Sequence, residues 1–358
     1  MSGGPGPAQR RGDVTGPVTI GIDVGGTKIL GLVVDGAGAV LAEAKASTPR
    51  LAPPGSPGGP GGDAVIETVA LVAERLLDAL DALDADADVT SDGVSAVGVG
   101  VPGMVDDAGM LRFAPNLPGG EGLDVRGRLT ERLGSRQVVV DNDATCAVMG
   151  EWIYGAAAGA TDAVVVTLGT GIGGGLVVND RVARGALGFA GEIGHMVVDP
   201  SGPACPCGKR GCWERFASGS GLGRLAREAA HAGRLVEVLR RAGGDPEAVR
   251  AEDVTTAAAA GDAGAQAVLE ELGWWLALGL ANLANILDPS VFVLGGGLVD
   301  ALDLVIEPVR TAFDDLVEGR LGRPEVMICL AALGERAGAV GAGVLARQDH
   351  RALSGRQG

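Results

Sequence analysis

The strongest constraint on the fold of this chain is a layout of strands and glycine-rich turns that occurs twice. Residues 18–36 read VTIGIDVGGTKILGLVVDG: an apolar strand, a Gly/Thr turn, a second apolar strand and the Asp-Gly signal of a hairpin. Residues 163–180 read AVVVTLGTGIGGGLVVND and repeat that order. Self-similarity over such a unit indicates an internal duplication. We therefore predict two α/β domains with a cleft between them.

The segments around the two copies complete an α/β pattern. Residues 39–47 form a third β-rich run, so the chain should open with a three-stranded meander. Apolar residues at helical spacing follow over 65–83, and a strand over 94–103 ends in a glycine turn. Further helices are expected around 221–242, 255–287, 301–318 and 335–348, and further strands at 291–297 and 325–331.

This order suggests where the domains begin and end. Residues 18–141 are predicted to form the smaller α/β domain, to which the helix at 335–348 returns, and residues 142–334 the larger one. Residues 1–17 are rich in Gly, Pro and Arg, and we expect a disordered N-terminal extension. The Pro- and Gly-rich residues 49–62 are predicted to be a long mobile loop.

Charge and the distribution of apolar residues exclude several classes of function. The 29 Lys and Arg residues against 45 Asp and Glu residues give a net charge of -16, which repels nucleic acids and anionic membranes. The apolar stretch 272–287 is shorter than the ~20 residues of a membrane span, so a buried core helix is expected. The N-terminus has no apolar signal-peptide core. We expect a cytoplasmic protein with no nucleic-acid or membrane partner.

Two glycine turns at matching positions of the duplicated units are candidate phosphate-binding motifs. Backbone amides in such turns can approach a phosphate, and a carboxylate at the end of a buried strand, as at Asp23, suits Mg²⁺. One turn alone would be interpreted as a tight hairpin, but two in duplicated positions predict a polyphosphate bound between them. Their residues are Asp23, Gly25, Gly26, Thr27 and Lys28 in the first turn and Gly169, Thr170 and Gly171 in the second.

A dehydrogenase is the alternative interpretation of the second turn. Gly169, Gly171 and Gly174 spell GxGxxG, the fingerprint of dinucleotide-binding proteins. That fingerprint requires a helix directly after the glycines, because the helix N-terminus receives the pyrophosphate. Here the run LVVNDRV follows, which reads as a strand and a turn, and the sequence has no GxxxxGK[ST] P-loop. Polyphosphate binding by two strand-to-strand turns is therefore favoured over the dehydrogenase.

A third glycine run ends a very apolar strand and includes Gly295 and Gly296. Glycine at this point leaves a flat backbone surface against which an adenosine could lie. A plain strand-to-helix turn would have the same sequence, and that alternative stays open.

A cysteine motif predicts a structural zinc site. Cys205, Cys207 and Cys212 form the pattern CxCGxxGC, and His195 upstream offers a fourth ligand. Cys₃His is a closed tetrahedral zinc set. A disulfide is a poor alternative because Cys205 and Cys207 are too close in sequence for an unstrained bridge. Cys146 and Cys329 are interpreted as ordinary core residues.

Polar residues gather where the two domains should meet. Asn142 and Asp143 directly follow an apolar strand, a position at which side chains of α/β proteins face the ligand crevice. A carboxylate there can take the proton of an attacking hydroxyl during phosphoryl transfer, so Asp143 is the candidate base. Each of these residues by itself would more simply be a cap or turn residue. The full group is Asn116, Asn142, Asp143, Glu192 and Glu214.

These motifs together resemble the ROK family of repressors and kinases, and within it the bacterial glucokinases, most closely those of actinobacteria. The resemblance runs from about residue 18 to residue 347. In family order it includes DVGGTK, PGMVD, APNLPG, DNDAT, LGTGIGGG, GEIGHM, CPCGKRGCWERFASG and DPSVFVLGGG. It implies an actin-like (ribonuclease H-like) sugar-kinase fold and a glycolytic ATP:glucose 6-phosphotransferase.

The resemblance also implies roles for individual residues. Asp143 would be the catalytic base, and Gly103, Asn116, Asn142, Glu192, His195 and Glu214 would line the hexose. His195 would bind zinc through one ring nitrogen and a sugar hydroxyl through the other. ATP, Mg²⁺ and a structural zinc ion are the implied cofactors, and the expected assembly is a homodimer or homotetramer.

The sequence departs from the family pattern at two places, and other functions in the family compete with the glucokinase. The segment after Asn116 reads LPGG where many relatives place a tryptophan, and Thr145 and Cys146 stand where asparagine and alanine are usual. Family repressors carry an N-terminal helix-turn-helix, for which we expect no room before Asp23. Other members phosphorylate fructose, allose, N-acetylmannosamine or N-acetylglucosamine, or use polyphosphate as donor. A non-catalytic sugar-sensing protein is the remaining alternative.

Overall fold

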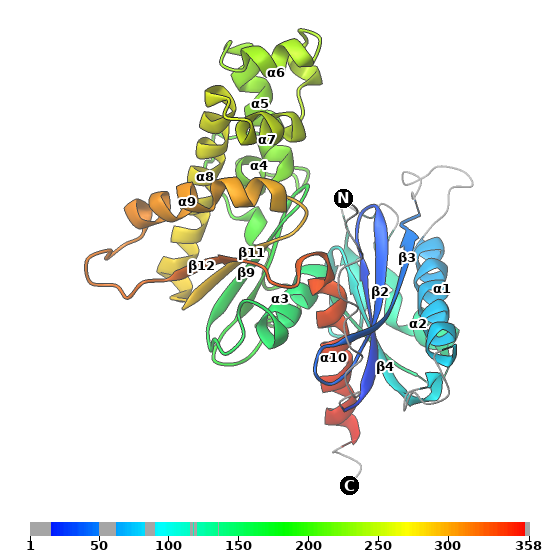
Figure 1. The fold of residues 1–358 in the computed structure, drawn as a ribbon. Helices are drawn as coiled ribbons and strands as arrows, with labels where there is room; N and C mark the ends of the chain where they lie inside the picture. The colour runs from blue at the N-terminus through cyan, green and yellow to red at the C-terminus, as the bar shows by residue number, and fades with distance from the viewer. Residues whose placement is uncertain are drawn as a thin grey trace, which may run out of the picture.

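The computed structural model describes residues 16–49, 62–82, 90–114, 117, 120–134 and 136–354. Most of the predicted N-terminal extension (1–17) and of the predicted loop (49–62) lies outside these residues, as does Asn116. The α/β class expected from the sequence is confirmed by two main sheets with helices on their faces (Figure 1).

The first sheet has five strands in the order β3-β2-β1-β4-β8. Strands β1, β2 and β3 form the predicted antiparallel meander, while β4 and β8 join it in parallel to β1. Helices α1 and α2 cover one face of this sheet (Figure 1). The bounds are β1 Val18–Val24, β2 Lys28–Val34, β3 Val40–Ser47, β4 Val94–Val101, β8 Gln137–Asn142, α1 Gly62–Asp81 and α2 Val125–Leu133.

The second sheet repeats the first with four strands in the order β10-β9-β11-β12. Strands β9 and β10 are antiparallel, and β11 and β12 are parallel to β9, so β10-β9-β11-β12 matches β2-β1-β4-β8. The predicted internal duplication is therefore present in the topology. The bounds are β9 Ala163–Leu168, β10 Ile172–Val177, β11 Val291–Gly295 and β12 Met327–Leu330.

Helices α8 (Ala263–Leu287) and α9 (Val299–Leu316) pack together and against the second sheet. The apolar stretch 272–287 lies in α8 and buries Leu272, Leu276 and Leu280 in that core. It is thus the core helix that the sequence predicts. No helix in the described residues combines the length and apolar character needed to cross a membrane.

A group of shorter helices extends beyond the second sheet, and a small sheet lies beside the first (Figure 1). The expected helical segments 221–242 and 255–287 are each broken in two, which corrects the prediction. Gly233 and Gly261, with φ of +72° and +87°, follow the ends of α5 and α7 and stop them. The bounds are α4 Glu214–Ala217, α5 Gly219–His231, α6 Val236–Arg241, α7 Ala251–Ala259, β5 Met104–Val105, β6 Met110–Phe113 and β7 Leu123–Asp124.

The last helix, α10 (Ala337–Ser354), packs backbone against backbone on the first sheet. A Cβ atom added at Gly21 would lie 1.8 Å from the Ala339 oxygen, and one at Gly98 would lie 1.9 Å from the Ala342 oxygen. The Thr19 hydroxyl donates to the Gly343 oxygen at 3.0 Å. Glycine is therefore required on β1 and β4 for the helix to approach this closely.

Helix α3 (Asp143–Tyr154), which lies against β9 and β10, packs on the other side of α10. A Cβ atom at Gly341 would lie 1.7 Å from the Cys146 oxygen. The α3–α10 pair thus connects the two sheets at the centre of the molecule (Figure 1).

We predict that Gly98→Ala destabilises the protein by about 2 kcal/mol or more, because the added methyl group collides with the α10 backbone. Gly93→Ala is the matched control, since a Cβ atom there meets nothing within 4 Å. Urea unfolding followed by circular dichroism measures both. Equal midpoints for the two variants would contradict the proposed close packing of α10.

Candidate active site

Asp143 is placed by the junction of β8 and α3. Asn142, the last residue of β8, caps α3: its Oδ1 accepts the Thr145 amide at 3.0 Å, while its Nδ2 donates to the Gly103 oxygen at 2.9 Å. The cap therefore joins α3 to the loop after β4. Asp143, the first residue of the helix, accepts the Ala144 amide at 2.8 Å. The sequence predicts both Asn142 and Asp143 as site residues but gives no signal for α3.

Asp143 and Asp23 line one cavity of about 230 Å³ between the two sheets. Asp23 comes from the end of β1, and the glycine run that begins at the end of β11 also lines the cavity. The cavity thus brings together residues that lie far apart in the sequence. Its predicted site residues are Asp23, Lys28, Asp143, Gly295 and Gly296.

Burial raises the pKa of both carboxyl groups in this cavity. Desolvation, with a further contribution from the charge on Glu192, raises the pKa of Asp143 to about 6, although the Ala144 amide lowers it. Desolvation and the charge on Asp143 raise the pKa of Asp23 to about 7, against the lowering effect of Lys28. Two such carboxylates form a donor set that suits a divalent oxygen-seeking cation such as Mg²⁺.

A larger cavity of about 1010 Å³ adjoins the first at Gly297, which lines both. It is lined by Gly169 and Thr170 of the β9–β10 turn and by residues of α5 and α7. The segment after the turn is strand β10, so no helix N-terminus follows the GxGxxG run, as the sequence predicts. This volume is sufficient for a nucleoside next to the carboxylates.

The first glycine turn joins β1 to β2 at the edge of the site. The Gly25 amide donates to the Lys28 oxygen at 2.9 Å, and the Thr48 hydroxyl donates to the Gly25 oxygen at 2.6 Å. Lys28 forms an ion pair with Glu335 at 2.6 Å. Gly25, Gly26 and Thr27 line neither of the two cavities in the described structure.

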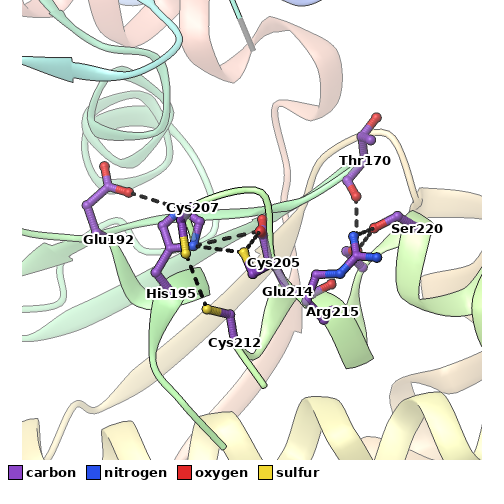
Figure 2. A network of polar contacts seen from close by, with 10 residues as sticks. Thr170, Glu192, His195, Cys205, Cys207, Cys212, Glu214, Arg215 and Ser220 are labelled. Atoms are coloured by element: carbon purple, nitrogen blue, oxygen red, sulfur yellow. Dashed lines mark hydrogen bonds and ion pairs between the residues drawn. The ribbon is translucent and has the colours of Figure 1, made fainter. Parts of the chain in front are cut away.

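His195, Cys205, Cys207 and Cys212 come together in one cluster, with all ligand atoms within 4.8 Å of one another (Figure 2). Cys205 Sγ lies 3.7 Å from His195 Nδ1, and Cys207 Sγ lies 3.6 Å from Cys212 Sγ. Zn–S bonds of about 2.3 Å in a tetrahedron place two sulfurs about 3.8 Å apart. The cluster therefore fits a tetrahedral zinc ion.

Two acidic residues flank His195 on opposite sides of its ring (Figure 2). Glu192 Oε2 lies 3.9 Å from Nε2, and Glu214 Oε1 lies 3.7 Å from Nδ1. The Cys205 thiol also donates to Glu214 Oε1 at 3.0 Å. With Nδ1 facing the cysteines, Nε2 stays available on the side of Glu192, whose charge also acts on Asp143.

Glu151 is a site residue that the sequence analysis missed. Its carboxylate is fully buried and lines the smaller cavity. It accepts the amides of Ala156 at 2.8 Å, Ala332 at 3.0 Å and Leu333 at 2.8 Å, and so ties α3 to the loop after β12. The signal for it was a single acidic residue in the otherwise apolar segment CAVMGEWIY. Thr167 and Glu335, which also line this cavity, carried no such signal.

We predict that Asp143→Asn raises stability at pH 7. A carboxyl pKa of 3.8 when unfolded and about 6 when folded gives stability that is fully present below about pH 4 and is lost as the pH rises through 6. The neutral amide avoids this loss, which amounts to about 2–3 kcal/mol at pH 7. Thermal unfolding of both proteins should give curves that converge at pH 4. A variant less stable than wild type at pH 7 would contradict the raised pKa.

Comparison with known proteins identifies the family. The model described as "ROK family" matches residues 63–349. A glucokinase of Streptomyces coelicolor is 37% identical over 92% of this chain and 98% of its own length. A solved ROK family glucokinase from Streptomyces griseus, in complex with glucose and AMPPNP, is 37% identical and superimposes with a TM-score of 0.77 over 92% of this chain and 99% of that one.

The matches also include a regulator. The xylose repressor of Bacillus subtilis is 29% identical over 70% of this chain and 60% of its own length. Kinases and repressors therefore share this architecture. From the matched family model and the glucokinase of Streptomyces coelicolor, we conclude that this chain belongs to the ROK family and has the actin-like, ribonuclease H-like fold of that family's sugar kinases.

Proposed function

We propose that this protein is an ATP-dependent glucokinase that phosphorylates glucose at its 6-hydroxyl group, with Asp143 as the general base. The observation that carries the proposal is the presence of Asp143 and Asp23 in one cavity that adjoins a nucleoside-sized cavity at Gly297. Glucose as substrate and ATP as donor are supported by the relatives named glucokinase and by the neighbour solved with glucose and AMPPNP.

The reaction transfers one phosphoryl group and one proton. The Asp143 carboxylate accepts the proton of the 6-hydroxyl group as that oxygen bonds to the γ-phosphorus, while the bond from the γ-phosphorus to the β–γ bridging oxygen breaks and ADP leaves. The proton then passes from Asp143 to solvent. A base with a pKa of about 6 is largely ionised at neutral pH and still binds a proton readily.

The other predicted residues bind the two substrates. Asp23 would hold Mg²⁺, which neutralises charge on the donor phosphates. The turns at residues 25–28 and 169–171 would bind those phosphates through their remaining backbone amides, since the amides of Gly25 and Gly169 are donated within the turns. The adenosine would lie beside the glycine run of Gly295 and Gly296, which reaches the larger cavity at Gly297. The hexose is bound by the residues assigned to it from the sequence, which are Gly103, Asn116, Asn142, Glu192, His195 and Glu214.

The Cys₃His cluster would hold a structural zinc ion, which fixes the loop that carries Glu192, His195 and Glu214. Nδ1 of His195 faces the cysteines, so Nε2 is free to bind a sugar hydroxyl. A zinc ion held there would fix the ring of His195, so that Nε2 orients a bound sugar, and would supply no chemistry to phosphoryl transfer.

A kinase assay over a panel of hexoses, with ATP or polyphosphate and Mg²⁺, tests the proposal. We expect the highest kcat/KM with glucose and ATP. Asp143→Asn should lower kcat by roughly 10²- to 10⁴-fold and leave glucose affinity nearly unchanged. A higher kcat/KM with fructose, allose or an N-acetylhexosamine than with glucose would mean that this other sugar is the substrate. Glucose binding without phosphorylation would reject the kinase in favour of a sugar sensor.

We also predict that Cys207→Ala leaves the protein folded, because Cys207 belongs to neither core, while its neighbour Trp213 stays buried in the core of the second sheet. Hexose affinity should fall about 10-fold or more, and more than ATP affinity, since the ring of His195 is no longer held by the metal. Elemental analysis should find one zinc ion per chain in the wild type and much less in the variant.

Cys329→Ala is the control for that variant. Cys329 is a half-buried thiol on β12 that belongs to a different contact, 3.7 Å from the Phe292 oxygen. It should keep its zinc ion and its hexose affinity. Purified wild-type protein that contains no zinc, or unchanged hexose affinity in Cys207→Ala, would contradict the assigned role of the cluster.

A further inference from the structure

Arg215 is a cation without an acidic partner beside the larger cavity. Among the described residues, its one side-chain contact is from Nη1 to the Ser220 hydroxyl, at a long 3.3 Å, and its Nε is buried with no acceptor. Three other arginines have a buried Nε without an acceptor, but each donates through another nitrogen to a carbonyl or carboxylate. In the part of the chain that the structure describes, Arg75, Arg181, Arg210 and Arg250 also lack such an acceptor, but all four are exposed to solvent, whereas the Nε of Arg215 is buried.

Arg215 lies against the β9–β10 turn through a fixed set of contacts. The Ser218 hydroxyl donates to the Thr170 oxygen at 3.0 Å, and the Gly219 amide donates to the Gly169 oxygen at 2.8 Å. These bonds hold the start of α5, including Ser220, on the turn. Because Arg215 contacts Ser220, its guanidinium group is held beside Gly169 and Thr170 (Figure 2).

Arg215 directly follows Glu214, and the two side chains diverge, Glu214 toward His195 and Cys205 and Arg215 toward Thr170 and Ser220 (Figure 2). Glu214 contacts Cys205 and His195, whereas Arg215 faces the cavity that receives the donor in the proposed function. The short helix α4 thus presents an anion toward the cysteine cluster and a cation toward the donor.

We propose that Arg215 binds the phosphate chain of the donor at the β9–β10 turn, an inference that rests on the proposed function. A guanidinium group with free N–H donors matches the oxygens of a di- or triphosphate in charge and in geometry. Arg227, which lines the same cavity, differs because Glu247 lies 3.6 Å from its Nε and neutralises it. Three arginines therefore line the cavity: Arg227 is paired, Arg250 is exposed to solvent, and Arg215 has a buried Nε without an acceptor.

Direct binding of ADP, AMP and adenosine to the full-length protein, measured by calorimetry, tests this role without requiring turnover. We expect Arg215→Gln to weaken ADP binding by roughly 10- to 100-fold, the usual effect of a lost charge-assisted hydrogen bond, and to leave adenosine binding unchanged. Arg215→Lys should recover part of the loss because it keeps the charge. Arg227→Gln should have a much smaller effect on ADP.

Each outcome decides the role of Arg215. Equal losses of ADP and adenosine affinity would mean that Arg215 only maintains the cavity wall. Equal losses of ADP affinity in the Arg215 and Arg227 variants would mean that any positive charge in the cavity binds the phosphates. Either result overturns the proposal. An ADP loss specific to Arg215 in a protein that fails to phosphorylate hexoses would support the role of Arg215 and reject the kinase. Normal ADP affinity in an Arg215→Gln variant that phosphorylates glucose would support the kinase and reject the role of Arg215.

Discussion

The geometry of the cleft depends on the backbone contact between α10 and its neighbours. The helix lies against β1 and β4 on one side and α3 on the other, at distances that leave no space for a Cβ atom at Gly21, Gly98 or Gly341. At its start, Gly338 is so close to Asp23 that an added Cβ atom would lie 2.7 Å from the carboxyl carbon. The same helix thus sets the position of β1, which carries Asp23, and of α3, which carries Asp143. These contacts join backbones closely, so they set the separation of the β1 and α3 backbones that carry the two carboxylates.

Three carboxylates near the centre of the molecule differ in how they are solvated. Glu151 is fully buried, yet three backbone amides satisfy it. Asp143 accepts one amide from its own helix, and the pKa values of Asp143 and Asp23 are both raised by desolvation. Glu151 is therefore placed to stabilise the structure, whereas Asp143 and Asp23 are placed where a proton or a cation is favourable. Such sites lower stability in exchange for function.

The parts of the site that the sequence predicts are those encoded over short distances. The two glycine turns and the CxCGxxGC motif each lie within a few residues. The duplication showed that the two turns belong together, and the ligand spacing alone indicated the metal site. Helix α3 escaped detection because residues 144–151 are all buried, which removes the 3.6-residue pattern. The helix breaks at Gly233 and Gly261 were missed because a glycine does not by itself mark a helix end in this chain. Gly223 and Gly279, for example, lie inside helices. Glu151 and Arg215 acquire their roles only from tertiary contacts, and the roles assigned to the individual site residues stay predictions.

The position of α10 in the sequence has a consequence for synthesis. Thr19 on β1 is hydrogen-bonded to Gly343, 324 residues later, and the face of β1 and β4 that carries Gly21 and Gly98 is covered by that last helix. A ribosome releases the first sheet long before its cover exists. The strands β9 to β12 and the helices between them are contiguous in the sequence, so they can assemble as they emerge. The half of the protein that is made first is therefore the half that is completed last.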